Sequence, residues 1–280
     1  NYNAGAWGAA ASTPTSASGI IFIRLPYTVT NTTVITVDQV IINTGATLTL
    51  SSNMTLADGP GTDMIIEGTI DCGSAVALSG AGSFAMSNGS NLIIRSTNGI
   101  TSSGASGNIQ TAIRTYNTNS NYSYSGTAAQ VTGNGLPATV NNLTIDNTTG
   151  VSLSGSVTSN GIVNLTTGAL NIAANNLTFQ NSNTPIVRTA GTITTSTSSN
   201  IAFGTPGNTG GTAFTLPAGT FTTAPIINNL TLYRDNSLNF NDQVISIGGI
   251  LLCNAPLNTN GKLTLLSTAA RTALINGSST

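Results

Sequence analysis

The chain has 280 residues, of which 5% are charged, and its formal net charge is -1 at pH 7. An ordinary soluble domain carries about 25% charged residues, and the 7 scattered cations here cannot form the basic patch that binds nucleic acid. The apolar run at residues 20–23 is far shorter than the roughly 20 residues that span a bilayer. We therefore expect no nucleic-acid binding and no membrane insertion.

Residues 1–19 are rich in small side chains and predict a lead or a cap for the structure that follows. They contain no charged region followed by an apolar stretch, so no signal peptide is visible. A surface that is polar but nearly uncharged invites association in a crowded solution. For that reason the composition favours a protein exported and fixed outside the cell.

From residue 20 onward, apolar and polar residues alternate in short runs, as in "TVITV" (33–37), "ATLTLSS" (46–52) and "KLTLLS" (262–267). A period of two indicates strands with one face turned inward, and the many Val, Ile and Thr residues argue against disorder. Asn, Gly and Ser-Gly pairs separate the runs, as turns require. The chain is predicted to be all-β.

An internal repeat distinguishes a solenoid from a β-sandwich. The motif "NNLT" begins at Asn141, Asn175 and Asn228, and the intervals between its copies fit two and three units of roughly 17 to 18 residues. Leu48 and Ile65 are separated by one such unit. We predict a right-handed parallel β-helix with coils of roughly 17–20 residues, forming one continuous domain over residues 20–280 or a fragment of a longer one.

A solenoid also accounts for the composition. Coils stack about 4.8 Å apart, so that like side chains form ladders. Uncharged ladders stack without repulsion, and asparagine amides can bond along the stack. With about 18 residues per coil, the rod would be roughly 70 Å long.

Two stretches resemble coils of large secreted β-helix proteins of Bacteroidetes, many of them type IX secretion substrates. They are "GATLTLSSNMTL" and the longer one that includes "YSYSGTAAQVTGNGLP" and "VNNLTI", the most specific part. The resemblance covers roughly residues 20–180 well and the rest loosely. It implies an adhesin or stalk at the cell surface, usually followed by a C-terminal sorting domain that the ending "RTALINGSST" does not resemble.

Candidate catalytic groups are scarce. The sequence has no histidine, which removes the Ser-His-Asp triad, the Cys-His dyad and every zinc site that uses histidine. One acidic cluster, Asp58, Asp63, Glu67 and Asp71, could hold a structural calcium, although its first two members fit a Gly-Pro turn. Arg95 and Arg114 lie too far along the chain to be paired with it. We predict no catalytic residue, no metal and no cofactor.

Three tyrosines, Tyr116, Tyr122 and Tyr124, gather in "RTYNTNSNYSYSG". Alternation places Tyr122 and Tyr124 on one face of a strand. Exposed tyrosines can stack on sugar rings or grip a protein, whereas buried ones would cap a loop or stack between coils. These three are the candidate ligand-binding residues.

Three functions remain in competition. The first is a non-catalytic, adhesin-like surface rod whose partner is a cell-surface or secretion-system protein or a surface glycan. The second is a β-helix carbohydrate-active enzyme or glycan-binding module. The third is ice binding through Thr-X-Thr ladders, but the motifs at Thr28, Thr47 and Thr192 are too unevenly spaced for a regular array. Blunt solenoid ends also predict end-to-end or filamentous self-association.

The two cysteines, Cys72 and Cys253, lie about ten coils apart in a single solenoid. A disulfide requires Cα atoms within about 7 Å, so both are predicted to be free thiols. Cys253 is expected to pack inward and Cys72 to be partly exposed at the end of a strand.

Overall fold

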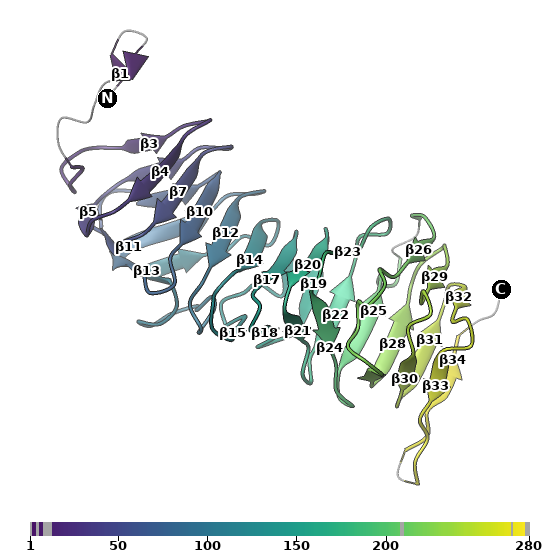
Figure 1. The fold of residues 1–280 in the computed structure, drawn as a ribbon. Helices are drawn as coiled ribbons and strands as arrows, with labels where there is room; N and C mark the ends of the chain where they lie inside the picture. The colour runs from purple at the N-terminus through teal and green to yellow at the C-terminus, as the bar shows by residue number, and fades with distance from the viewer. Residues whose placement is uncertain (1, 4–5, 8–12, 208–209, 270, 278–280) are drawn as a thin grey trace.

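The protein is a parallel β-solenoid, as the sequence predicts. The computed structural model describes residues 13–207, 210–269 and 271–277, together with the backbone of residues 2–3 and 6–7. These residues wind into a stack of about 12 turns that runs as a rod from one terminus to the other (Figure 1). The described residues contain no helix, and hence none long and apolar enough to cross a bilayer. Residues 1, 4–5 and 8–12 of the predicted lead lie outside the described residues.

Two sheets form the faces of the N-terminal part of the rod. Sheet 1 contains β4 (Thr28–Asn31), β7 (Thr47–Leu50), β10 (Thr69–Cys72), β12 (Asn91–Ile94), β14 (Asn121–Tyr124), β17 (Leu143–Asp146), β20 (Val163–Thr167) and β23 (Ile186–Arg188). Sheet 2 contains β3 (Ile21–Ile23), β5 (Ile35–Val37), β6 (Val40–Ile42), β8 (Met54–Leu56), β9 (Met64–Ile66), β11 (Leu78–Met86) and β13 (Ile109–Thr115). The long strand β11 pairs with β8 through its first residues and with β9 through its last, so it joins two faces.

Four further sheets form the faces of the C-terminal part. Sheet 3 contains β16 (Thr139–Val140), β19 (Val157–Ser159), β22 (Asn176–Phe179), β25 (Asn200–Phe203), β28 (Asn229–Leu232), β31 (Ile250–Cys253) and β34 (Leu274–Asn276). Sheet 4 contains β15 (Gln130–Val131), β18 (Val151–Ser152), β21 (Ala169–Asn171) and β24 (Thr192–Thr194). Sheet 5 contains β26 (Phe214–Thr215), β29 (Leu238–Asn239) and β32 (Leu257–Asn258), and sheet 6 contains β27 (Ile226–Ile227), β30 (Ile245–Ile247) and β33 (Leu263–Leu265). A short antiparallel hairpin of β1 (Tyr2–Asn3) and β2 (Ala6–Trp7) precedes the coils.

The coils are longer and less uniform than the sequence predicts. Stacked positions lie 19 residues apart between Ser152 and Asn171, but 30 apart between Asn91 and Asn121. About 12 turns at ~4.8 Å per turn give a rod of roughly 58 Å, shorter than the predicted ~70 Å.

The repeat length predicted from the "NNLT" motif is wrong, because the motif occurs on more than one face of the coil. The leucine of its first copy, Leu143, lies in sheet 1, whereas Leu177 and Leu230 lie in sheet 3. Leu177 and Leu230 are two turns apart, with Ile201 between them, rather than three. Every face needs the same alternation, so a motif that satisfies one face also satisfies the others.

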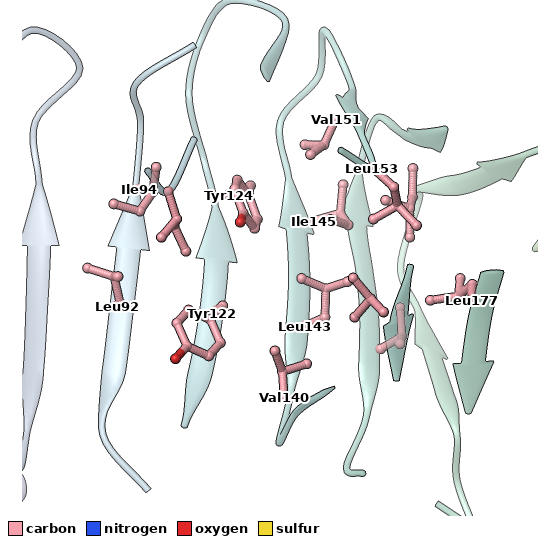
Figure 2. Packing of buried hydrophobic residues seen from close by; sticks show 14 of the residues in the cluster. Leu92, Ile94, Tyr122, Tyr124, Val140, Leu143, Ile145, Val151, Leu153 and Leu177 are labelled. Carbon is pink, nitrogen blue, oxygen red and sulfur yellow. The ribbon is translucent and has the colours of Figure 1, made fainter. Parts of the chain in front are cut away.

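The interior is a series of apolar columns that run along the axis. Along sheet 1 one column passes through Leu48, Ile70, Leu92, Tyr122, Leu143, Val163 and Ile186, each at most 2% exposed. Strands with the burial pattern of β7 place alternate residues inside and outside. Figure 2 shows this packing in the middle of the rod, where side chains from successive strands fill the space between the faces. Burial of these side chains is the main stabilising contribution to the stack.

Asparagine ladders bind the coils together on the outside, as the sequence analysis predicts. The side-chain amide of Asn121 donates to Asn91 Oδ1 (2.9 Å), and that of Asn141 donates to Asn121 Oδ1 (2.8 Å). A second ladder repeats the pattern, with Asn200 donating to Asn176 (2.7 Å) and Asn228 to Asn200 (2.9 Å). Each amide therefore donates to the preceding coil, which adds bonds parallel to those of the backbone.

Buried polar side chains at one corner bind backbone groups of adjacent coils. Asn108 Oδ1 accepts the amides of Arg95 (3.0 Å) and Ser96 (2.8 Å), and its Nδ2 donates to the carbonyl of Gly73 (2.8 Å). Gln130 Nε2 donates to the carbonyls of Ile94 and Ser96 (3.1 and 3.0 Å). Because these bonds satisfy backbone groups where the strands are interrupted, the corner can be buried at low cost.

Candidate functional site

The structure places Tyr122 and Tyr124 inside the coil, not on its surface. Both rings are fully buried, and they lie between the apolar side chains of the neighbouring strands (Figure 2). Tyr122 donates its hydroxyl to the carbonyl of Asn117 (2.7 Å), and Tyr124 donates to that of Thr132 (2.8 Å). The shared face that alternation predicts is correct, but it is the inner face. This burial corrects the expectation of an exposed ligand platform, because the rings are stacked between coils.

Burial also determines the protonation state of the two tyrosines. Loss of solvent around the ring raises the pKa of Tyr122, and the pKa of Tyr124 is raised well above its ordinary value for the same reason. Both hydroxyls therefore stay protonated and act as hydrogen-bond donors to the backbone. Neither ring is available to stack on a sugar at the surface.

Tyr116, the third candidate, contacts the loop between β12 and β13 and fixes its position. Its ring packs against Phe84, with 5.9 Å between the centroids, and its hydroxyl donates to the carbonyl of Thr101 (3.1 Å). Arg114 donates to the hydroxyl of Thr101 (2.7 Å) and to the carbonyl of Gly104. Together these contacts fix the insertion between β12 and β13, which lengthens this coil, and this is the loop-cap alternative that the sequence left open.

Asp63 of the acidic cluster is fully buried and holds a turn. Its Oδ1 accepts the amide of Gly59 (2.9 Å), and its Oδ2 accepts both the amide and the hydroxyl of Ser83 (2.7 and 2.9 Å). Burial alone would raise the pKa of this carboxyl. The hydrogen bonds from Ser83 and Gly59 outweigh that effect and hold the pKa below its ordinary value. The carboxylate is thus a structural link across the Gly-Pro turn.

The other members of the cluster point to separate partners. Asp71 forms an ion pair with Arg95, which also donates to the carbonyl of Cys72 (2.8 Å). Asn43 donates to Glu67 Oε2 (3.1 Å), and Asp58 is exposed. Within the described residues, no three acidic, cysteine or histidine side chains are grouped as a metal site would require. The pairing of Arg95 with Asp71 corrects the expectation that this arginine is too distant, because β10 and β12 are adjacent in sheet 1.

Outward-facing threonines form a small array near the N-terminal end. Thr28, Thr47 and Thr69 stack in one column, and Thr30 and Thr49 stack in the next until Asp71 interrupts it. The array is more regular than the Thr-X-Thr spacing predicts, because Thr69 lacks the second threonine that would reveal it in the sequence. It spans only three coils, and asparagine follows in the column at β12.

A shallow, uncharged trough lies on the outer side of sheet 3. It has a volume of about 300 Å³ and is lined by Asn176, Thr178, Asn200, Ile201, Ala202, Asn229 and Thr231. Ala202 stacks between Thr178 and Thr231, so its short side chain leaves a gap between two hydroxyls. The asparagine ladder forms the adjacent wall.

This trough is not evident from the sequence. The repeated Asn-Leu-Thr motif was its signal, since it puts an asparagine and a threonine on the same outward face. Recognising the site required the register that stacks residues 176, 200 and 229. A hydroxyl-rich and amide-rich surface of this kind can exchange hydrogen bonds with the hydroxyl groups of a glycan.

Comparison with protein-family models, with curated proteins and with solved structures finds no match for this chain.

Proposed function

We propose that the protein is an extracellular, non-catalytic rod of adhesin-like type that displays a binding surface at the cell surface. The observation that supports this best is the uninterrupted stack of coils along one axis (Figure 1). Its outer faces carry asparagine and threonine ladders in place of charges. Such a stack supplies length and a repeated surface, which are the properties that a stalk needs.

The stacking explains how a rod of this kind would work. Each coil contacts mainly its two neighbours, so stability is a sum of coil and interface contributions, and length can be added without a new core. Parallel backbone bonds connect one coil to the next from β4 to β23 in sheet 1, and asparagine amides add to them between β12 and β17. The protein would hold its binding surface at a fixed distance from its anchor.

The surface location is proposed from two features of the sequence. Only 5% of the residues are charged, and the coils resemble those of secreted Bacteroidetes β-helix proteins that use type IX secretion. On this proposal the partner is a cell-surface or secretion-system protein or a surface glycan.

The proposal is tested by deleting the gene from its host and measuring surface attachment and motility. We expect attachment to fall and to return when the intact chain is supplied. Unchanged attachment and motility would count against the adhesin-like role. A second measurement, labelling of intact cells with an antibody to the chain, tests the surface location independently of adhesion.

A second candidate function, a glycan-binding module, is favoured by the trough on sheet 3. An arginine in place of Ala202 would fill the gap between Thr178 and Thr231, and we expect Ala202→Arg to abolish retention on a polysaccharide that the wild type binds. Thr55→Arg is the matched control, since Thr55 faces outward from a different sheet. Equal loss in both variants, or in neither, would remove the trough from consideration.

The enzyme alternative has its own test. The protein is incubated with neutral and acidic polysaccharides, with and without calcium. Cleavage that disappears on substitution of Glu67, in a variant that keeps the fold, would replace the rod proposal with a hydrolase or lyase.

A further inference from the structure

The turn between β32 and β33 has an asparagine followed by a glycine at its centre. The amide of Lys262 donates to the carbonyl of Thr259 (2.8 Å) and closes the turn. The two residues between them have a positive φ, 49° at Asn260 and 73° at Gly261, and both are exposed. Two successive positive φ values indicate a type I′ turn, for which Asn-Gly is a preferred pair.

An Asn-Gly pair carries a reaction within its own main chain. The glycine nitrogen loses its proton to water and attacks Cγ of the asparagine. The bond from Cγ to Nδ2 breaks, and Nδ2 takes up a proton and leaves as ammonia. Water then opens the cyclic imide to aspartate or isoaspartate. The glycine N–H must be free of other hydrogen bonds for this attack, and the lack of a Cβ makes glycine the least hindered residue.

Four other Asn-Gly pairs lie in the coils, and the stack binds the glycine amide of each one. The amides and the carbonyls that accept them are Gly89 and Asn119 (3.1 Å), Gly99 and Ser96 (3.0 Å), Gly135 and Ile100 (2.8 Å), and Gly161 and Asn141 (2.7 Å). No described residue accepts the amide of Gly261. A sixth pair, Asn276–Gly277, ends the described part of the chain.

The free glycine amide follows from the geometry of the turn, whatever coil lies beyond it. The same turn occurs one coil earlier, where the amide of Gln243 donates to the carbonyl of Phe240 (3.1 Å). Its central residues, Asn241 and Asp242, have φ values of 51° and 60°. The next coil covers this turn, since β32 pairs with β29. Even so, both central residues are exposed, and no described residue accepts the amide of Asp242.

We infer that Asn260 is a site of autocatalytic modification, at which the chain converts a side-chain amide into a carboxylate. Asn260 Nδ2 donates to Asp242 Oδ1 of the preceding coil (3.0 Å). The product loses this donor and places one carboxylate beside another, which repel each other. Isoaspartate also lengthens the main chain of the turn. The reaction therefore loosens the link between β29 and β32, and it is independent of what the rod binds.

The inference is tested by incubating the intact chain at neutral and mildly alkaline pH, followed by peptide mapping and labelling with an isoaspartyl methyltransferase. Asn260 is expected to convert at least about tenfold faster than the other four pairs, because their glycine amides must first leave a hydrogen bond in the stack. The five pairs should convert at similar rates in denaturing urea. Equal rates in the folded chain, or a lead of Asn260 that persists in urea, would overturn the inference.

Two variants separate the turn geometry from the sequence pair. Asp242→Gly creates an Asn-Gly pair in the earlier turn, where the φ of 60° suits glycine, and it is expected to gain conversion at Asn241. Asn176→Gly also creates such a pair, but the amide of residue 176 donates to Ser156 Oγ (3.0 Å), so Asn175 should stay intact. Circular dichroism checks that both variants keep the fold. An unmodified Asn241 in the first variant, or equally fast conversion of Asn175 in the second, would contradict the role of the free amide.

Discussion

The two end coils of the rod and the coils next to them carry aliphatic side chains in the same register, but these side chains differ in burial. Leu48 and Leu251 are each 2% exposed, whereas the residues stacked on them, Val29 and Ile275, are 42% and 60% exposed. The inward direction of a side chain is set by its own strand. Its burial is supplied by the next coil. In this protein the core is therefore a property of neighbouring pairs of coils, and it weakens toward both ends.

The two cysteines provide the most sensitive probe of that gradient. Cys72 lies in the third coil and is fully buried, and burial raises the pKa of its thiol to about 12. Cys253 lies near the C-terminal end and is partly exposed, with a pKa that burial also raises. Both thiols are free, as predicted, but their expected exposures were reversed. We expect a thiol reagent at pH 8 to modify Cys253 at least about a hundredfold faster, because the thiolate is the reactive form.

The measurement uses the single-cysteine variants Cys72→Ala and Cys253→Ala, followed by titration in denaturant without reductant. Two groups per wild-type chain should react once the protein is unfolded. Equal rates for the two thiols in the folded protein would show that the third coil opens as readily as the last coils.

Truncation of two inner side chains of one column, one in the end coil and one in the next, measures the same difference in burial as a change in the free energy of unfolding. Leu48→Ala removes a side chain that is enclosed by coils on both sides, and we expect it to lower the free energy of unfolding by about 3 kcal/mol. Val29→Ala removes a half-exposed side chain from the same column and should lower it by less than about 1 kcal/mol. Hydrogen exchange of β4 and β7 amides is the appropriate measurement, since solenoids unfold locally.

The costs of Leu48→Ala and Val29→Ala together report whether the first coil is covered in solution. A cost for Val29→Ala as large as that for Leu48→Ala would mean that the first coil is covered in solution.

The fold class could be predicted from the sequence because a period of two is a local property of each strand. The register could not, because similar motifs serve several faces: Leu143 and Leu177 belong to different sheets despite their shared "NNLT". The tyrosines show the same limit. Alternation placed Tyr122 and Tyr124 on one face, but which face is inside depends on the next coil, where Leu143 and Ile145 pack on them.

Side-chain pairings between neighbouring coils could not be predicted from the sequence either. Arg95 is 24 residues from Asp71, a separation that has no meaning until the coil length is known. The coil lengths vary because of insertions such as the loop that Tyr116 and Arg114 hold. A repeat that changes length cannot be extrapolated from a few clear coils.

Asp63 links two coils in the buried part of the rod, and its substitution is expected to cause the next largest loss in the free energy of unfolding. Asp63→Asn should lower the free energy of unfolding by about 2 kcal/mol at neutral pH, because a charged acceptor of the amide of Ser83 is lost. The pKa of the folded carboxyl is depressed. Its stabilising contribution is therefore present above the unfolded pKa of about 3.9 and is lost as pH falls through the folded pKa.

Urea midpoints of wild type and Asp63→Asn, measured from neutral pH down to acid, should converge below about pH 4. Asp58→Asn is the matched control, since Asp58 lies in the same turn and is exposed. A difference between wild type and Asp63→Asn that grows as pH falls would contradict the assigned direction of the pKa shift.

The smallest effect is expected from the ion pair between Asp71 and Arg95, which also joins two coils but lies at the surface. The two side chains are 20% and 29% exposed, so solvent and salt screen their attraction. A double-mutant cycle with Asp71→Ala and Arg95→Ala should give a coupling of about 0.5 kcal/mol that declines as salt is added. Arg95→Ala alone should lower the free energy of unfolding by more than this coupling energy, because Arg95 also donates to the carbonyl of Cys72. A salt-independent coupling above about 2 kcal/mol, well beyond the range of exposed ion pairs, would mean that water is excluded from this ion pair as fully as from the inner apolar column of sheet 1. The distinction between buried and peripheral links would then fail.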